Sequence, residues 1–362
     1  VGTTYEIHLE PGTYTGQGAA ALQQSVRIIG SGSAETILEG SDEWRTGLMM
    51  TVGTSPTLTV RDLSMRNFEQ ALLIHTDGGC VNLEGVEIYA CETGVKLVDS
   101  FQLTLNMAGT VVSESTTAVE VIGGGHNVIM NGVVEHNELG IVIDADAIRV
   151  ETVQVLNNSQ HGIVLQDGSH HQVTDCLIVD NNISGVAVFT CCAQINFNHI
   201  EGNRCWGVFA DEASAGQPVR PPYNYWGCDD SGPFHVDTNP MGIGDPVSDG
   251  VIYQPWLGQS GGASDDGDGD GWSNLQEQQA GTDPNDPGES PELPTIYVAP
   301  SGNDAHLGDA AHPLNSLQAA VEMLNRLPEP PVGTTYEIHL EPGTYTGQGA
   351  ATLHQSVRII GS

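Results

Sequence analysis

The sequence predicts an all-β protein, a parallel β-helix solenoid, and three observations support this. A short apolar segment headed by a small residue occurs seven times between Ala71 and Gly207. A second apolar column and a column of polar turn residues keep the same spacing. A fixed period of about 22 residues, built from strand-length apolar pieces and Gly/Asn turns with no helical periodicity, is typical of a β-solenoid.

The columns define which residues stack from coil to coil. The repeated segments start at Ala71, Gly94, Ala118, Gly140, Gly162, Gly185 and Gly207, with spacings of 23, 24, 22, 22, 23 and 22 residues. Their second residues are predicted to point inward: Leu72, Val95, Val119, Ile141, Ile163, Val186 and Val208. The second apolar column is Met65, Ile88, Val111, Val133, Val155, Ile178 and Ile200. The turn column, four residues before the small residue, contains Asn67, His136, Asn158, Asn181 and Asn203.

Adjacent parallel strands lie about 4.8 Å apart, so side chains in one column touch. We therefore predict that Asn158, Asn181 and Asn203 form a structural ladder of amides that bond along the stack. This interpretation is favoured over a binding site.

The charge balance limits the partners. The chain of 362 residues has 10 basic and 46 acidic residues, for a net charge of −36. Such a charge argues against binding nucleic acid or an anionic membrane. It suits a soluble extracellular protein, a cation-binding protein or a high-salt habitat. No apolar run reaches the roughly 18 residues that a membrane span needs, so none is predicted.

The seven cysteines form no zinc-binding pattern. Cys205 and Cys228 are 23 residues apart, about one coil, so stacking could bring them within disulfide range. This spacing is compatible with a disulfide between the two cysteines and also with two free thiols.

The two ends of the chain are nearly identical. Residues 332–362 repeat residues 1–31 with two differences, Ala21/Thr352 and Gln23/His354. This predicts one period of a longer tandem array followed by the start of the next period.

A distinctive stretch follows the regular coils. Asn224-Tyr225-Trp226-Gly227 is followed by a Ser-Gly-Pro at 231–233, by Asn239-Pro240 and by Pro255-Trp256-Leu257. This order resembles the closing segment of secreted bacterial right-handed β-helix proteins, the pectate-lyase-like group. The resemblance covers residues 1–258. It implies a right-handed solenoid, burial of Trp226 and Trp256 over the last coil, and an extracellular or cell-surface location on a bacterium.

An acidic linker, 259–294, is predicted next, and it contains the oxygen pattern of an EF-hand loop. Asp266, Asp268 and Asp270 take the first, third and fifth loop positions, and Gly271 takes the sixth. The Trp272 carbonyl, Asn274 and Glu277 take the seventh, ninth and twelfth. This order predicts a Ca²⁺ site, because calcium takes several oxygen ligands. The alternative is a merely acidic, solvated linker.

The residues after this loop, Ala280 to Pro284, resemble thrombospondin-type-3-like calcium repeats. Asp283, together with Asp286, is a candidate for a second, weaker calcium site.

The last region, 295–362, is predicted to be the amino-terminal cap and the first coils of the next repeat. A strand near Ile296 is followed by an amphipathic helix with Leu317, Ala320, Val321 and Leu324 on one face. Asn315 or Ser316 is the candidate N-cap, and Pro328 limits the helix. The strand and helix resemble the cap of the same β-helix group. The cap that belongs to the solenoid at Val1 is then expected upstream.

Pectate-lyase-like folds often host enzymes that act on acidic polysaccharides, so the resemblance makes catalysis one alternative for this chain. The outward middle position of the repeated strand reads Leu73, Lys96, Glu120, Val142, Val164, Ala187 and Phe209. One basic residue and several apolar ones are a poor cleft for a polyanion, and the G-H-G and R-x-K motifs of polygalacturonases are absent. No catalytic residue is therefore predicted. The densest titratable group, Asp167, His170, His171 and Asp175, is interpreted as a solvated turn in preference to a metal or base site.

The sequence thus favours a non-enzymatic structural repeat unit of a fibre, sheath or adhesin stalk. Its units would be joined head to tail through calcium-stabilised linkers. Lateral contact between copies of the repeat is a second possible arrangement. The alternative is an extracellular polysaccharide-binding or -cleaving module with polysaccharide as its partner.

Overall fold

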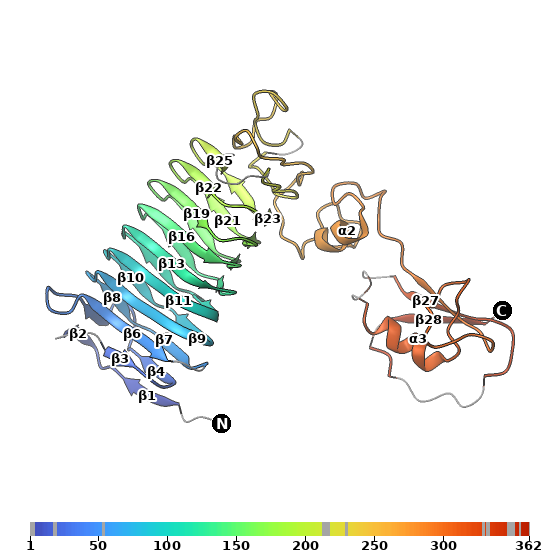
Figure 1. Cartoon of the computed structure of the whole chain (residues 1–362), viewed down its shortest axis with the longest axis horizontal. Coiled ribbons are helices and arrows are strands. Elements are labelled where there is room, and N and C mark those ends of the chain that lie inside the picture. The colour runs from blue at the N-terminus through green and yellow to red at the C-terminus, as the bar shows by residue number, and fades with distance from the viewer. Residues whose placement is uncertain are drawn as a thin grey trace. The chain divides into compact units, whose positions relative to one another are not determined.

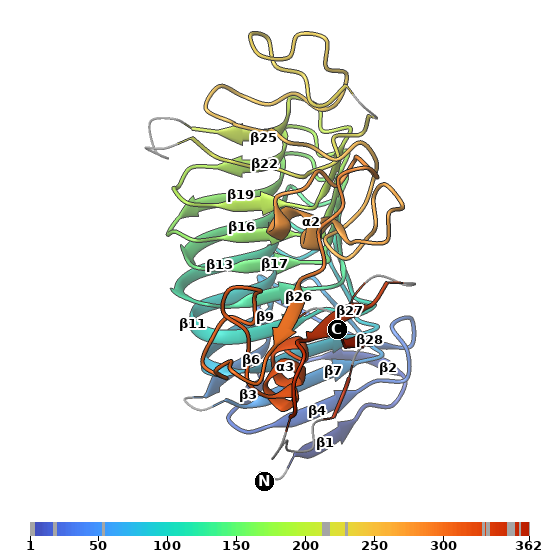
Figure 2. The ribbon, with the colours of Figure 1, turned by 90° about the vertical axis from the view of Figure 1, so that its right-hand side faces the viewer.

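The chain forms two compact units, Val1–Ala263 and Ser264–Ser362, in the computed structural model. The structure describes residues 4–16, 20–52, 55–211, 218–228, 231–327, 330, 334–345, 352–354 and 356–361. Figures 1 and 2 show the first unit as coils stacked in order from β1 (Tyr5–His8) to β25 (Trp206–Ala210). Among the described residues, no helix combines the length and apolar character needed to cross a membrane.

The solenoid is built from two parallel sheets, and each coil contributes strands to both. The larger sheet follows the order β1, β4 (Val26–Ile29), β7 (Thr57–Arg61), β9 (Gln70–Glu84), β11 (Thr93–Asn106), β13 (Thr117–Gly125), β16 (Leu139–Asp146), β19 (His161–Asp167), β22 (Ser184–Val188) and β25. Six further strands join it beside this path: β3 (Ala20–Leu22), β6 (Thr46–Val52), β14 (Val128–Met130), β17 (Arg149–Glu151), β20 (Gln172–Thr174) and β23 (Gln194–Asn196). The predicted all-β parallel solenoid is confirmed.

The second sheet has nine short strands that stack in chain order. They are β2 (Gly12–Thr15), β5 (Thr36–Glu39), β8 (Ser64–Arg66), β10 (Glu87–Tyr89), β12 (Val111–Ser113), β15 (Val133–Glu135), β18 (Gln154–Leu156), β21 (Leu177–Val179) and β24 (His199–Glu201). Every pairing between the described strands of the solenoid is parallel, as expected when each coil lies on the previous one.

The strand register confirms the first inward column and corrects the second. Leu72, Val95, Val119, Ile141, Ile163, Val186 and Val208 pair in sequence and are fully buried. In the second column, Val112 and Val134 align with Ile88 and Val155 and point into the core. The predicted members Val111 and Val133 are half-buried neighbours. Two adjacent valines fit one spacing equally well, so the period alone could not select the inward one.

The amides of Asn158, Asn181 and Asn203 form a buried ladder inside one turn of successive coils. Asn158 Nδ2 donates to Asn181 Oδ1 at 2.9 Å, and Asn181 Nδ2 donates to Asn203 Oδ1 at 2.9 Å. The next coil upstream contributes Asn137, whose Nδ2 donates to Asn158 Oδ1 at 3.2 Å. His136, the residue counted in the sequence column, instead has a positive φ of 57° and makes the turn before it.

The ladder explains why small residues head the repeated strands. A Cβ added at Gly162 would lie 2.9 Å from Asn181 Nδ2 and 2.7 Å from the Gly185 carbonyl oxygen. A Cβ at Gly185 would meet Asn203 Nδ2 at the same 2.9 Å. The small residue and the asparagine are therefore two parts of one packing arrangement.

The closing segment ends the solenoid with an irregular layer. Trp226 is almost fully buried against the last coil, and Trp256 is half-buried and packs against the same core. Asp245 occupies the ladder position above Asn203 and accepts from its backbone N at 2.9 Å and its Nδ2 at 2.8 Å. An aspartate thus terminates the asparagine ladder.

Cys205 and Cys228 are both free thiols in the structure, so the predicted candidate disulfide between them is wrong. A parallel β-bridge pairs His199 with Tyr225. In this register Cys228 lies beside Gly202, three residues before Cys205. Cys205 is exposed, whereas Cys228 is buried and its thiol donates to the Gly232 carbonyl at 3.2 Å. The closing layer has lost the 23-residue offset on which the disulfide depended.

The second unit has its own small core. It contains α2 (Asn274–Ala280), β26 (Thr295–Val298), α3 (Leu317–Leu324), β27 (Tyr336–Leu340) and β28 (Val357–Gly361). The three strands form a parallel sheet in that order. α3 begins after the N-cap Ser316, whose side chain accepts from Ala319 N at 3.1 Å. Its buried residues Ala320, Val321 and Leu324 pack with the sheet, as the predicted apolar face requires.

Candidate functional site

A hollow of about 430 Å³ lies where the last coil meets the closing segment. One wall comes from β25 and the other from closing-segment residues around His235 and Ser248. The closing segment is held on β25 because Ser248 N donates to the Val208 carbonyl at 3.2 Å and Ala210 N donates to Ser248 Oγ at 2.8 Å. We call this hollow the aromatic pocket.

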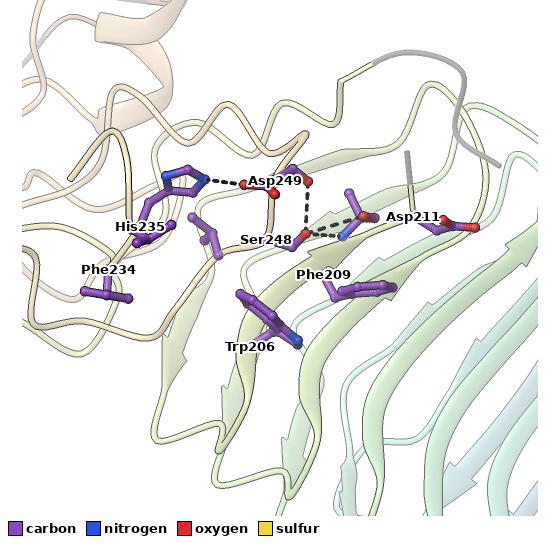
Figure 3. A pocket seen from close by; sticks show the side chains of 10 residues that line it. Trp206, Phe209, Asp211, Phe234, His235, Ser248 and Asp249 are labelled. Carbon is purple, nitrogen blue, oxygen red and sulfur yellow. Dashed lines mark hydrogen bonds and ion pairs between the residues drawn. The ribbon is translucent and has the colours of Figure 1, made fainter. Parts of the chain in front are cut away.

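Aromatic rings form the β25 side of the aromatic pocket. Trp206 and Phe209 lie together there, with ring centroids 6.3 Å apart (Figure 3). Phe189, from the coil beneath, extends the strip with its ring 5.8 Å from that of Phe209. On the closing-segment side, Phe234 keeps 38 % of its surface exposed and adds a further ring. The pocket therefore offers an apolar platform next to solvent.

A histidine–carboxylate pair faces this platform. His235 is buried, and its Nε2 lies 3.3 Å from Asp249 Oδ1, whose side chain is 80 % exposed (Figure 3). His235 Nδ1 accepts from the backbone N of Thr238 at 3.1 Å and of Asp237 at 3.3 Å. Because Nδ1 is the acceptor, the proton of a neutral ring is on Nε2 and points at Asp249. The imidazole thus holds an exposed carboxylate at the pocket mouth.

Asp211 places a second carboxylate in the same lining. Neither arginine nor lysine lines the described part of the pocket. The described lining therefore combines aromatic faces, two carboxylates and a histidine, and it offers no cation to attract an anionic ligand.

Two other hollows on the solenoid surface lack this combination. One, of about 440 Å³, is lined by Tyr89 and the acidic residues Glu87, Glu114 and Glu135. The other, of about 720 Å³, is polar and includes the Arg45–Glu69 ion pair. The aromatic pocket is the better candidate for a ligand site because it joins a broad apolar surface to directed polar groups.

The Asp167, His170, His171 and Asp175 group does not form a shared site. His171 is fully buried, its Nδ1 accepts from Ile148 N at 3.3 Å and its Nε2 lies 2.9 Å from the Asp167 carbonyl oxygen. Burial lowers the pKa of His171, which favours the neutral ring. Asp175 Oδ1 instead accepts from Ala263 N at 2.6 Å. His171 thus satisfies backbone groups inside the fold.

The acidic loop brings its first three aspartates together. One carboxylate oxygen from each of Asp266, Asp268 and Asp270 lies within 4.8 Å of the others, and no other such group of histidine, cysteine or acidic residues occurs in the described ranges. The loop backbone orients them: Gly271 N donates to Asp266 at 2.9 Å, and Trp272 N donates to Asp270 Oδ1 at 2.8 Å. Backbone N–H groups thus hold both oxygens of Asp266 and one oxygen each of Asp268 and Asp270.

Glu277 completes the acidic group from α2. It is fully buried, and neither of its carboxylate oxygens has a hydrogen-bond partner in the described residues. The same is true of Asp268 Oδ2 and Asp270 Oδ2. Burial, together with the charges of Asp268 and Asp270, raises the pKa of Glu277 to about 8. Buried carboxylates without partners are costly unless a cation binds them, so this donor set fits a hard metal ion.

The remaining predicted ligands are placed differently. Asn274 Oδ1 accepts from Gly267 N at 3.1 Å, which gives it a role in closing the loop. Asp283 Oδ1 accepts from the backbone N and the Nδ2 of Asn285, both at 3.0 Å, and Asp286 Oδ1 accepts from Gly288 N at 2.9 Å. Asp283 and Asp286 therefore each stabilise a turn and are not brought together as a second site.

The aromatic pocket was missed by the sequence analysis. Phe209 was recognised as an outward residue, but His235 and Asp249 come from the irregular closing segment. No period places those residues over a given coil. The signal that was present is the concentration of aromatic residues after Trp206.

Comparison with known proteins supports the fold. Residues 70–219 match the family model described as a right-handed β-helix region. No curated protein matches the chain. The parallel β-helix is therefore right-handed, in agreement with the resemblance noted from the closing segment.

Several solved structures resemble the chain at low identity. The A-module of the mannuronan C-5 epimerase AlgE6 from Azotobacter vinelandii has 17 % identity and a TM-score of 0.45, covering 63 % of this chain and 80 % of that one. Pectate lyase Pel9A has 15 % identity and a TM-score of 0.37, covering 80 % and 79 %. The catalytic domain of a GH87 α-1,3-glucanase has 9 % identity and a TM-score of 0.30, covering 60 % and 59 %.

These findings correct the functional prediction. The expectation that the chain is not an enzyme is contradicted, because the structures that it resembles are an epimerase, a lyase and a glucanase.

Proposed function

We propose that this chain is a β-helix module that binds and cleaves a polysaccharide, with one sugar ring seated in the aromatic pocket. The observation that carries the proposal is the pocket lining: aromatic faces on β25 opposite a histidine-held carboxylate, with a second carboxylate nearby. A pyranose ring has an apolar C–H face and a rim of hydroxyl groups. The C–H face can pack on an aromatic ring, and the hydroxyl groups can donate hydrogen bonds to carboxylates.

The charge of the pocket selects among polysaccharides. Asp211 and Asp249 would repel a uronate, and no cation in the described lining compensates. The net charge of −36 acts in the same direction at long range. The proposed substrate class is therefore a neutral polysaccharide.

The two carboxylates supply the chemistry. Glycoside hydrolysis uses one carboxyl group to protonate the leaving oxygen and a second to activate water or to attack the sugar carbon. Asp249, held by His235, and Asp211 are the candidates for these roles. In the reaction, the glycosidic C–O bond breaks, its oxygen receives the acid's proton, and water supplies the hydroxyl of the new reducing end.

Binding is tested first, with the full chain and a set of neutral and acidic polysaccharides in affinity electrophoresis and calorimetry. Phe234→Ala is expected to weaken binding of a neutral polysaccharide about tenfold, which corresponds to ~1.4 kcal/mol. Phe101→Ala is the matched control, because Phe101 is similarly exposed, at 47 % against 38 %, and lies on β11 outside the pocket lining. Equal binding by both variants, or retention of polyuronates only, would reject the pocket as a neutral-sugar site.

Cleavage is tested separately by the release of reducing ends. Asp249→Asn is expected to lower kcat at least about 100-fold and to leave KM within about threefold, because general acid–base catalysis typically contributes 10²–10⁴-fold. Asp144→Asn, an exposed aspartate on β16, serves as the control. Binding without any cleavage of the tested neutral polysaccharides would leave the binding proposal standing and overturn the catalytic one.

We also propose that the loop from Asp266 to Glu277 binds Ca²⁺. Support comes from the three clustered aspartates and from the buried carboxylate of Glu277, which has no hydrogen-bond partner in the described residues. Asp266, Asp268, Asp270 and Glu277 would hold the ion, and the Trp272 carbonyl occupies the seventh position of the loop. A bound cation would neutralise the crowded carboxylates and stabilise the loop and α2. The extracellular, bacterial location remains a prediction that suits such a site.

Calcium binding is measured by titration calorimetry of the full chain after treatment with chelator. Glu277→Gln is expected to weaken calcium binding at least about tenfold, because affinity depends on the number of charged ligands. Glu289→Gln is the control, since Glu289 is exposed and outside the loop. No heat of binding by the unaltered chain, or equal affinity of both variants, would show that the loop is only an acidic linker.

A further inference from the structure

The same sequence occurs in both units, and its first strand makes the same pairing in each. β1 and β27 share the residues Tyr-Glu-Ile-His. Each pairs in parallel with the strand that carries the shared residues Val-Arg-Ile-Ile, β1 with β4 and β27 with β28. The Glu6–Arg27 ion pair at 2.5 Å has its counterpart in Glu337–Arg358 at 3.2 Å. A difference in exposure between β1 and β27 therefore comes from what lies against each strand.

The cover differs sharply. Tyr5 and Ile7 are 54 % and 43 % exposed, whereas their equivalents Tyr336 and Ile338 are 1 % and 0 % exposed. In the second unit, β26 pairs in parallel with β27, and α3 joins the same core. In the first unit, β1 is the end of the described sheet and has its neighbour β4 on one side.

Individual hydrogen bonds and close contacts show the same difference between the two copies. Tyr345 Oη lies 2.8 Å from two carbonyl oxygens, that of Glu341 within its own segment and that of Val298 in β26. Its equivalent, Tyr14, bonds to the Glu10 carbonyl at 2.9 Å. The equivalent glycines Gly343 and Gly12 show the same contrast. A Cβ on Gly343 would meet Pro300 of the cap at 2.3 Å, whereas one on Gly12 would have nothing within 4 Å. The first coil thus carries the contact surface of the cap without the cap.

We propose that the exposed edge of β1 is the docking surface for a second copy of the 295–331 segment, joined on the amino-terminal side of Val1. The chain itself shows this order, because residue 331 is followed directly by the repeated sequence that starts at Val332. The docked strand would pair with β1 as β26 pairs with β27, and its helix would cover Tyr5 and Ile7. This proposal rests on the burial of the two copies and does not depend on the proposed enzymatic function.

Exchange of the cap between two copies of the present chain is not the favoured source. If β26 and α3 left β27 to cover the β1 of another molecule, Tyr336 and Ile338 would become exposed in place of Tyr5 and Ile7. The apolar area buried would be unchanged, so the exchange has no hydrophobic driving force. A further copy of the segment buries new area and does not uncover any.

The test uses the full chain lengthened by a copy of residues 295–331 placed directly before Val1. Amide hydrogen exchange is followed by mass spectrometry in peptides that run from β1 through Ala21 and Gln23. These two residues differ from Thr352 and His354, so the peptide masses separate the first copy from the second. We expect the β1 amides of the extended chain to exchange at least about tenfold more slowly than those of the unextended chain. Their protection would then approach that of the β27 amides.

The control is the same extension with Val298→Asp in the added copy only, because Val298 is fully buried in the existing cap. This variant should leave β1 as fast to exchange as it is without an extension. Unchanged exchange of β1 in the correctly extended chain would overturn the proposal. Equal protection by the unaltered and the Val298→Asp extensions would overturn it as well, since tethering alone would then explain the effect.

Discussion

At the scale of single residues, the solenoid depends on buried polar side chains as well as on its apolar columns. Asn181 is fully buried and uses its whole amide. Its Oδ1 accepts from Asn158 N at 3.1 Å and Asn158 Nδ2 at 2.9 Å, while its Nδ2 donates to the Val155 carbonyl at 3.1 Å and Asn203 Oδ1 at 2.9 Å. One asparagine therefore satisfies groups in three successive coils, and its removal leaves several of them unpaired.

Asn181→Ala is expected to lower the free energy of unfolding of the solenoid by about 2–4 kcal/mol, since each buried polar group left without a partner costs about 1–3 kcal/mol. Chemical denaturation measures this loss. Asn182→Ala is the matched control, because Asn182 is exposed and its side chain bonds to Ser159 and Arg204 at the surface. A loss of less than about 1 kcal/mol for Asn181→Ala would contradict the ladder as a stabilising element.

The end of the ladder predicts a pH dependence. Burial raises the pKa of Asp245 above its ordinary value, despite the hydrogen bonds from Asn203. The folded state therefore binds this proton more tightly than the unfolded state does. Its contribution to stability is present below the unfolded pKa of about 3.9 and is lost as the pH rises through the folded pKa.

Asp245→Asn removes that titration and keeps an oxygen acceptor for Asn203. The stability of this variant relative to the unaltered chain is expected to increase as the pH rises from about 4 to about 7. Urea denaturation at both pH values gives the two differences. A difference that is constant, or that changes in the opposite direction, would contradict the role assigned to Asp245. Asp144→Asn shows the background from an exposed aspartate.

At the scale of elements, the regular coils and α3 could be predicted because a period or an N-cap defines them. The inward column from Leu72 to Val208 was identified in full. In the second column, the spacing selected Val111 and Val133, each one residue before the valine that aligns with Ile88. The closing segment has no period, so neither the level of Cys228 nor the aromatic pocket followed from the sequence. In the acidic loop, spacing identified Glu277, but only the fold shows its burial and that Asn274 closes the loop.

The acidic loop predicts how α2 responds to calcium. Without the ion, repulsion among Asp268, Asp270 and the buried Glu277 should loosen the helix that Glu277 belongs to. Chelator is expected to speed amide exchange in α2 at least about tenfold and to leave the solenoid strands unchanged. Identical exchange with calcium and with chelator would show that α2 needs no ion.

At the scale of the whole molecule, two separate apolar cores account for the two units. The core of the first unit runs from Val26 to Tyr253, and that of the second contains Ile296, α3 residues and Ile338. The solenoid core is continuous and contains no metal ligand assigned above. It provides the rigid support on which β25 and the closing segment place the aromatic pocket.

The most direct test of this account is whether the full chain acts on a neutral polysaccharide through the aromatic pocket. The measurement is reducing-end release from neutral and uronate polysaccharides, by the unaltered chain and by Asp249→Asn. We predict release from a neutral polysaccharide that falls at least about 100-fold in Asp249→Asn. Release confined to polyuronates, or release that Asp249→Asn does not reduce, would contradict the account.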